Sequence, residues 1–215
     1  MNSGNAAIVR SSKETLMRTT QKSPPALLTT GLPDLTAPPK GMTFVETVTV
    51  KGFGKLKIRP IQLDDEEEMI GFHRRISKES IYMRYFEFLD LDARTAHERL
   101  ARICKNSGES YAIVMETAAS PREPEAILAV GRLTVTDKPY EATFDTLIAV
   151  EKDAERLAKV LLGRLVQLAK AFGFQSLVGE LLVSDRDTLN LCRELGFSLH
   201  TLPADGLVRT TLEFK

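Results

Sequence analysis

The sequence predicts a mixed α/β fold, and three observations indicate it. The 215 residues alternate short strand-like runs with amphipathic helical segments. The strand-like runs dominate the middle of the chain, and helical segments interrupt them at two places. An apolar strand at 142–150 also passes through one short turn into a long helix at 153–172. Elements in this order form a mixed sheet with helices packed against it.

Composition limits the class of protein. The 29 basic and 29 acidic residues give a formal net charge of zero, which argues against a surface built to bind nucleic acid. A hydrophobic content of 43% suffices for a core, and the length fits one domain and a tail. The two cysteines form no C-x-x-C pair, as in a reduced cytoplasmic protein.

Several segments and sites are not expected. No run of about 18 apolar residues occurs, so we predict neither a transmembrane helix nor a membrane partner. The first residues lack the apolar stretch of a secretion signal, which again favours the cytoplasm. His73, His97 and His200 are far apart without the spacing of metal ligands, so no metal is expected.

Residues 1–41 differ in composition from the rest. They are rich in Ser, Thr, Pro and Lys, and few apolar residues recur at a fixed period. We predict a flexible tail there, with a short helix at 6–20, and one domain at 42–215. The tail is either a solvated leader or a segment that docks on a partner or lipid surface.

The first elements of the domain have local signals. Phe44–Val50 has strand composition, a glycine-rich turn follows, and Lys55–Arg59 alternates, which predicts a hairpin. Asp64 and Glu67 form a capping-box pattern that opens a helix through Ile76. Two further helices are expected at 78–88 and 93–104.

The second half carries the strongest periodicity. Strands are predicted at 110–117, 126–136 and 142–150. Apolar residues of the helix at 153–172 share one face, and Gly173 is a plausible C-cap. A strand at 176–183, a helix at 187–195 and two strands at 197–201 and 207–214 complete the order.

The strand-to-helix junction at 150–153 predicts an anion site. The first N–H groups of a helix lack partners, and the helix dipole is positive there, which suits a phosphate-bearing ligand. This turn has no glycine, however, although glycine usually lets backbone amides approach phosphate.

Two strings carry a resemblance to a known family. Residues 72–86 read FHRRISKESIYMRYF, residues 96–104 read AHERLARIC, and Leu195-Gly196-Phe197 follows a late helix. The chain resembles the GNAT N-acetyltransferase superfamily over roughly 56–197. More narrowly, it resembles the acetyltransferase domains of bacterial protein lysine acetyltransferases and of acyl-CoA synthetase fusions. The resemblance implies a mixed, mostly antiparallel sheet flanked by helices.

The resemblance also implies acetyl-CoA as the acyl donor. In such enzymes two central strands splay apart around the donor, and its pyrophosphate binds a loop of the form [RQ]-x-x-G-x-[GA]. That loop corresponds to 153–158, and Ile148 and Val150 would face the acyl and pantetheine end. The phosphate cradle would comprise Ala154, Arg156, Leu157, Ala158 and Lys159. Asp185, where Asn is common, is a further cofactor-binding candidate or a helix cap.

The loop departs from the family pattern. Asp153 replaces Arg or Gln, Arg156 replaces the central glycine, and only Ala158 fits. Asp153 and Glu155 oppose the helix dipole at a cost of about 1 kcal/mol or less each. Arg156 and Lys159 could offset this through side-chain contacts to phosphate.

The general base is a second departure. Related enzymes carry glutamate where this chain has Thr143. Glu141 lies two residues earlier on the same strand face and is our first candidate, and Asp145 is the second. The alternative is that both are solvent-facing strand residues. A family tyrosine that acts as general acid corresponds to Cys192, for which a packed thiol is the alternative.

The resemblance therefore implies an N-acetyltransferase. It would move an acetyl group from acetyl-CoA to a primary amine, of a small molecule or a protein lysine, and a homodimer is one possible assembly. Tyr82, Arg84, Tyr85 and Phe86 could wall the acceptor site; alternatively, the aromatics are core and Arg84 pairs with a carboxylate. The altered loop and Thr143 leave a second reading open, a catalytically degenerate domain that binds and regulates.

Overall fold

The computed structural model describes residues 33–39, 45–118, 125–203 and 205–214, and the structural statements below concern these residues. The helix expected at 6–20 and most of the tail at 1–41 lie outside them. In the described segment 33–39, the Leu35 side chain is fully buried in the main core. This part of the expected tail therefore packs with the domain.

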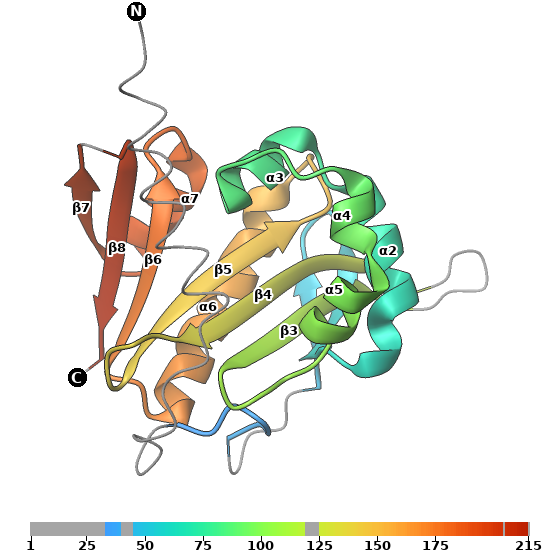
Figure 1. Cartoon of the computed structure of the whole chain (residues 1–215), viewed down its shortest axis with the longest axis horizontal. Helices are drawn as coiled ribbons and strands as arrows, with labels where there is room; N and C mark the ends of the chain where they lie inside the picture. Colours follow the sequence, from blue (N-terminus) through green and yellow to red (C-terminus); the bar gives the residue numbers. More distant parts are fainter. Residues whose placement is uncertain (1–32, 40–44, 119–124, 204, 215) are drawn as a thin grey trace, which may run out of the picture.

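One mixed sheet forms the centre of the molecule (Figure 1). Its order is β1-β2-β3-β4-β5-β6-β8-β7, and among neighbouring strands β5 and β6 run parallel while the other pairs are antiparallel. This confirms the predicted mixed, mostly antiparallel sheet. The strands are β1 (Glu46–Val50), β2 (Gly54–Pro60), β3 (Ser110–Thr117), β4 (Ile127–Val135), β5 (Glu141–Ile148), β6 (Ser176–Leu182), β7 (Ser198–Leu202) and β8 (Leu207–Glu213).

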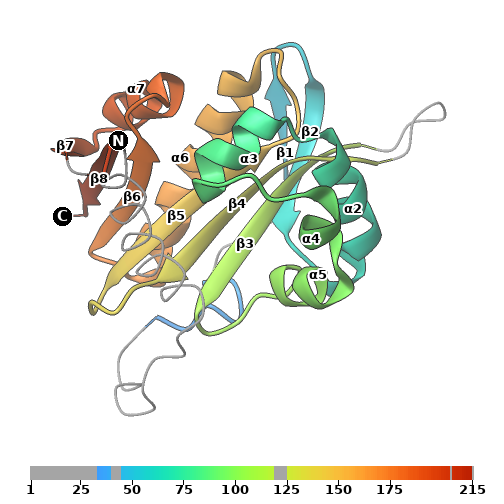
Figure 2. The ribbon, with the colours of Figure 1, turned by 45° about the horizontal axis from the view of Figure 1, so that its top comes forward.

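Helices cover both faces of the sheet (Figure 2). The first group, α2 to α5, packs on one face over a smaller core, and α6 and α7 pack on the other over the main core. The helices are η1 (Leu63–Asp65), α2 (Glu66–Arg75), α3 (Lys78–Tyr85), α4 (Leu91–Thr95), α5 (His97–Ile103), α6 (Ala154–Phe172) and α7 (Arg186–Glu194).

Three predicted helices differ from the structure. The helix expected at 78–88 ends at Tyr85, and Phe86 is its left-handed C-cap. The single helix expected at 93–104 is two short helices, because Ala96 adopts an extended backbone with ψ 131° between them. The capping box expected at Asp64 and Glu67 forms two residues earlier, between Gln62 and Asp65 at the start of η1. The backbone N–H of Gln62 donates to Asp65 Oδ2 at 2.7 Å, because Asp65 also binds Arg59 and is buried.

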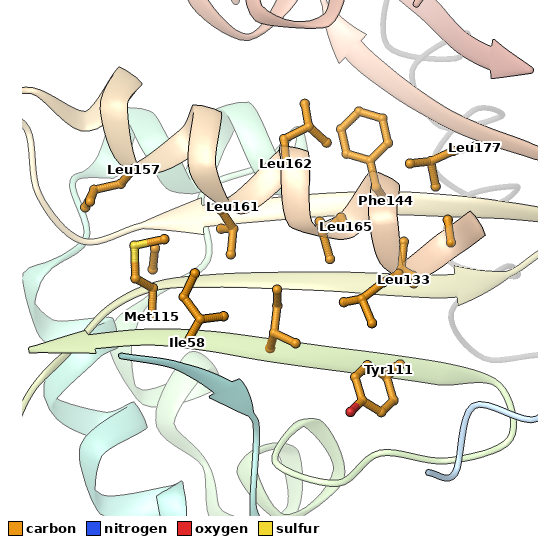
Figure 3. Packing of buried hydrophobic residues seen from close by; sticks show 14 of the residues in the cluster. Ile58, Tyr111, Met115, Leu133, Phe144, Leu157, Leu161, Leu162, Leu165 and Leu177 are labelled. Atoms are coloured by element: carbon orange, nitrogen blue, oxygen red, sulfur yellow. The ribbon is translucent and has the colours of Figure 1, made fainter. Parts of the chain in front are cut away.

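The long helix α6 lies close to the sheet. A Cβ added at Gly131 of β4 would come within 3.0 Å of Leu161 and Leu165, so this glycine allows the helix to approach. Figure 3 shows Leu157, Leu161 and Leu165 packed between α6 and the strands. The helix ends at Gly173, which has a φ of 87° and forms the expected C-cap.

The parallel pair of strands is short. Residues 141–143 of β5 pair with 176–178 of β6, and no further register pairs join these two strands. Beyond this point the strands diverge (Figures 1 and 2). The ring of Phe144 lies against Gly179 immediately after the last pair, on the side of the main core. The divergence is the feature that positions the candidate site.

Candidate active site

The diverging ends of β5 and β6 lie between two helices. On one face α3 contacts both strands, and on the other face α6 contacts both. Alternate β5 residues point to opposite faces, so Phe144 and Ile148 pack with the main core. Asp145 points to the other face, where it meets Arg84 of α3.

The loop after β5 presents the N-terminus of α6. Asp153 is the N-cap residue, has a left-handed φ of 59°, and its side chain makes no capping hydrogen bond to the helix backbone. Asp tolerates this conformation better than most residues, which allows a tight turn without glycine. The backbone amides at the start of α6 are therefore not covered by the N-cap side chain.

The Arg156 side chain turns toward the β1–β2 hairpin. Its Nη1 donates to the Lys51 carbonyl at 3.0 Å, and its Nη2 lies 3.1 Å from Asp153 Oδ1. The guanidinium thus neutralises the carboxylate that opposes the helix dipole. The unfavourable interaction between the Asp153 carboxylate and the helix dipole is thus offset within the loop. The same contacts use two of the hydrogen-bonding groups of Arg156.

The other expected cradle residues have mixed positions. The Leu157 side chain is fully buried in the main core, so it can offer a ligand only its backbone. Ala154 and Ala158 are half-buried at the start of α6. Lys159 reaches across to α7, where its Nζ lies 2.8 Å from Glu194 Oε2. The start of α6 can therefore offer a phosphate group its backbone N–H groups, while the Lys159 side chain is directed toward α7.

Further expected donor-binding residues lie on either side of the divergence. Ile148 and Val150 pack against the main core at the open end of β5. Asp185 precedes α7 and its Oδ1 accepts from the Thr188 N–H at 3.2 Å. Its side chain is thus used as a helix cap.

Glu141 does not lie with the other candidates. It sits in the paired end of β5, roughly 23 Å from Ile148 by the rise of a strand. Its carboxylate lies 3.4 Å from Arg209 and 3.5 Å from Lys138. These contacts fix it in an ion-pair group on the sheet face, away from the diverging ends.

Asp145 is closer to the divergence. It lies two residues beyond the last β5–β6 pair, and its Oδ2 is 2.6 Å from Arg84 Nη2. Both side chains are about one quarter exposed. Thr143, at the family's glutamate position, donates weakly to the Thr134 carbonyl at 3.4 Å and carries no acid.

Cys192 is a packed thiol. It is fully buried on α7, and burial raises its pKa to about 12, against a smaller opposing effect of a hydrogen bond with Thr210. A thiol in this environment stays protonated at neutral pH and is not accessible to solvent. The packed alternative therefore describes its position.

The aromatic residues of α3 divide between surface and core. Tyr82 is 39% exposed and stacks on Phe88, which is 71% exposed, with ring centroids 5.0 Å apart. Tyr85 packs against the smaller core. Phe86 ends the helix with a left-handed φ of 56°. Arg84 pairs with a carboxylate, as one sequence alternative expected.

Arg132 was not among the residues that the sequence placed near the candidate site. This β4 residue stands directly opposite Asp145 in the β4–β5 register. It donates to the Ser110 hydroxyl at 3.1 Å and to the Ile103 carbonyl. Arg132 is the single charged residue in the apolar sequence of β4, which could have marked it as unusual. Its position opposite Asp145 depends on how β4 pairs with β5, which the sequence does not specify.

Metal and membrane features are not found in the described part of the chain. No group of three His, Cys, Asp or Glu residues there could hold a metal ion. None of the described helices is long and apolar enough to span a membrane.

The strand order, the short parallel pair and the helix that follows β5 define a GNAT-type acetyltransferase fold, as predicted. No protein-family model matches the chain. Solved structures do: the GNAT domain of PAT from S. lividans has a TM-score of 0.65 at 21% identity. That match covers 80% of this chain and 97% of the domain.

Two ligand-bound structures share the fold. The Salmonella typhimurium acetyltransferase yncA, solved with its cofactor acetyl-CoA, has a TM-score of 0.54 at 16% identity, covering 74% of this chain and 93% of its own. Mycobacterium smegmatis RimJ, solved with CoA-disulfide, has a TM-score of 0.56 at 12% identity, covering 82% and 90%. At these identities the likeness concerns the fold.

Proposed function

We propose that this protein is an N-acetyltransferase that moves an acetyl group from acetyl-CoA to a primary amine. The amine belongs to a small molecule or to a protein lysine. The observation that carries the proposal is the divergence of β5 and β6 after three residue pairs, followed directly by a helix N-terminus without a side-chain cap. Two structures with this fold bind CoA compounds.

The donor would lie between the diverging strands. Its pyrophosphate would accept hydrogen bonds from the first amides of α6, where the helix dipole favours an anion. The Arg156 guanidinium, which contacts Asp153 and Lys51, would support this binding by offsetting the negative charge of Asp153. The acetyl end would then lie near the last β5–β6 pair.

Asp145 is the better-placed proton acceptor in this arrangement. An unperturbed lysine amine has a pKa near 10.4 and must lose a proton before it attacks. The amine nitrogen attacks the thioester carbon, its proton passes to the carboxylate directly or through water, and the CoA sulfur leaves. Glu141, our first candidate from sequence, is held by Arg209 and Lys138 at the paired end.

One observation favours a second candidate function. The family's glutamate position is Thr143, and Arg156 stands at the central glycine position with its guanidinium engaged by the loop. These features fit a domain that binds a ligand or protein and regulates without catalysis. The two candidates differ in whether acetyl-CoA binds and whether amines are acetylated.

Calorimetry with acetyl-CoA tests the proposal. We expect binding by the full chain, and we expect Arg156→Ala to weaken it by about tenfold, as for loss of one charge-assisted contact. Arg74→Ala, which removes an exposed arginine from α2, is the matched control and should bind as the unaltered protein does.

The outcome separates the candidates. Binding together with acetylation of a model amine supports the enzyme. Binding without any turnover favours the regulatory domain. No detectable binding at millimolar acetyl-CoA contradicts the acetyltransferase.

A further inference from the structure

We propose that Arg84 occupies the position of the acceptor's ammonium group, and that Asp145 is the acceptor-binding carboxylate. The inference rests on the proposed function and deepens it: the acceptor is a cationic primary amine, which must displace an internal arginine. The free protein is then closed to acceptors by its own side chain.

The first support is where the ion pair lies. Asp145 is the first β5 residue after the last β5–β6 pair whose side chain faces α3. Arg84 comes from α3, the helix that contacts both diverging strands on that face. Its guanidinium nitrogen lies 2.6 Å from the carboxylate, within the distance of a charge-assisted hydrogen bond. An amine bound there would lie beside the proposed acetyl position.

The second support is the aromatic surface that holds the cation. The Arg84 guanidinium carbon lies 5.0 Å from the centroid of the Tyr85 ring. A carboxylate and an aromatic face together favour a cation, and both remain in place when a different cation binds. The pair is about one quarter exposed, so solvent reaches it.

The third support is the charge balance around Asp145. Arg132 stands opposite Asp145 on β4, and its side chain donates to Ser110 and Ile103. Burial lowers the pKa of Arg132, while the Asp145 charge opposes this and the Arg84 charge adds to it. Arg84 and Arg132 thus repel one another across one carboxylate. An acceptor ammonium in place of the Arg84 guanidinium would leave the net charge beside Asp145 unchanged. In this exchange the partly exposed Arg84 side chain would rotate toward solvent.

Once the acceptor ammonium has replaced the Arg84 guanidinium beside Asp145, the reaction can follow. The bound ammonium gives one proton to Asp145, directly or through a water molecule. The resulting amine forms a C–N bond with the thioester carbonyl carbon, and the C–S bond breaks. The nitrogen loses its second proton and the thiolate takes up a proton in exchange, so the products are an amide and free CoA as a thiol.

Arg84→Lys tests the inference without a separate acceptor. This substitution puts a primary amine at the proposed acceptor position, so incubation with acetyl-CoA should acetylate the protein at residue 84. Mass spectrometry of the digested protein reads the site. A tethered amine beside the thioester should react faster than a distant one by on the order of tenfold or more.

Two comparisons control for non-specific acetylation. Lys78 lies at the start of the same helix and serves as an internal reference. Arg99→Lys is the matched variant, because Arg99 also approaches the Tyr85 ring, at 5.4 Å, and donates to its hydroxyl rather than to Asp145. Circular dichroism confirms that each variant is folded.

Arg84→Ala supplies a second measurement that does not depend on the lysine variant. With n-butylamine as acceptor, its KM should fall about tenfold or more, while the Kd for acetyl-CoA stays unchanged. A merely structural role for Arg84 would change both constants.

Selective acetylation at residue 84, or the selective fall in KM, supports the inference. If the unaltered protein binds acetyl-CoA but neither effect appears in folded variants, Arg84 does not occupy the acceptor position. Absence of acetyl-CoA binding in the unaltered protein overturns the proposed function and this inference with it.

Discussion

Gly179 determines how Phe144 fits at the point where β5 and β6 separate. A Cβ at residue 179 would lie 2.6 Å from Phe144 Cε1 and 3.1 Å from the Thr210 hydroxyl oxygen. Phe144 in turn packs edge-to-face on Phe197, with ring centroids 5.4 Å apart. The missing side chain thus leaves room for a ring that joins β5 to the last part of the chain.

We predict that Gly179→Ala destabilises the protein by about 1–3 kcal/mol, because an added methyl group overpacks the site. Urea unfolding followed by circular dichroism measures the free energy of unfolding. Gly163→Ala is the matched control. Gly163 lies within α6 with open space around its position, so alanine there should stabilise by up to about 1 kcal/mol. Equal effects of both substitutions would contradict the packing argument.

At the residue scale, the sequence indicates contacts only between neighbours in the chain, and the roles proposed for the site residues stay predictions. The loop position of Asp153 and the capping role of Asp185 follow from neighbours in the chain. The partner of Arg156 is the Lys51 carbonyl, 105 residues away, and no local pattern indicates it. The position of Glu141 likewise depends on Arg209 from another strand.

Arg59 joins three elements through one buried ion-pair network. Its guanidinium binds Asp65 of η1 at 2.6 Å and Glu116 of β3 at 2.6 Å, while Arg59 itself belongs to β2. Both carboxylates are almost fully buried. These contacts raise the pKa of Arg59, the hydrogen bond with Asp65 first, and outweigh the opposing effect of burial.

We predict that Arg59→Met destabilises the protein by about 3–5 kcal/mol, because it leaves two buried carboxylates without their main cation. Differential scanning calorimetry should show a large decrease in Tm. Glu194→Gln breaks the exposed Lys159 pair between α6 and α7 and should change stability by about 1 kcal/mol or less. A small effect at Arg59 would mean that Lys57, 3.0 Å from Glu116, is a sufficient partner.

The elements themselves were largely predictable because hydrophobic periodicity is local. The alternation of β2, the apolar face of α6 and its Gly173 cap gave the right element types. The break at Ala96 was missed because its extended backbone serves tertiary packing of α4 and α5. The family resemblance implied a mixed, mostly antiparallel sheet, but the strand order was not predicted, since periodicity does not specify which strands pair.

At the scale of the whole molecule, His73 should make the free energy of unfolding depend on pH. Its side chain is 1% exposed, and neither ring nitrogen has a hydrogen-bond partner among the described residues. Burial, followed by the charges of Arg94 and Arg99, lowers its pKa to about 4 from 6.5. The imidazole is therefore neutral in the folded protein at neutral pH.

The sign of the pH dependence follows from this lowered pKa. Below pH 6.5 the unfolded chain binds a proton at His73 that the folded protein does not bind until about pH 4. We predict that its contribution to stability is complete above pH 6.5 and decreases by about 3 kcal/mol as the pH falls to 4. Denaturant unfolding at a series of pH values measures this.

His73→Leu provides the comparison, because carboxylates in ion pairs also titrate at low pH. The difference between the unaltered and variant profiles should change between pH 6.5 and 4. His200→Gln, on the exposed face of β7, should leave the profile of the unaltered protein in place. Parallel profiles for the unaltered protein and His73→Leu would show that His73 is not responsible.

The three residue pairs between β5 and β6 also make a seam across the molecule. Five strands lie on one side and three on the other, and each group has longer antiparallel ladders of its own. With so few backbone hydrogen bonds crossing it, the seam is the line along which the sheet bends most easily. A ligand bound between β5 and β6 would contact both groups of strands. It would therefore restrict their relative motion, which the few backbone hydrogen bonds between them limit only weakly.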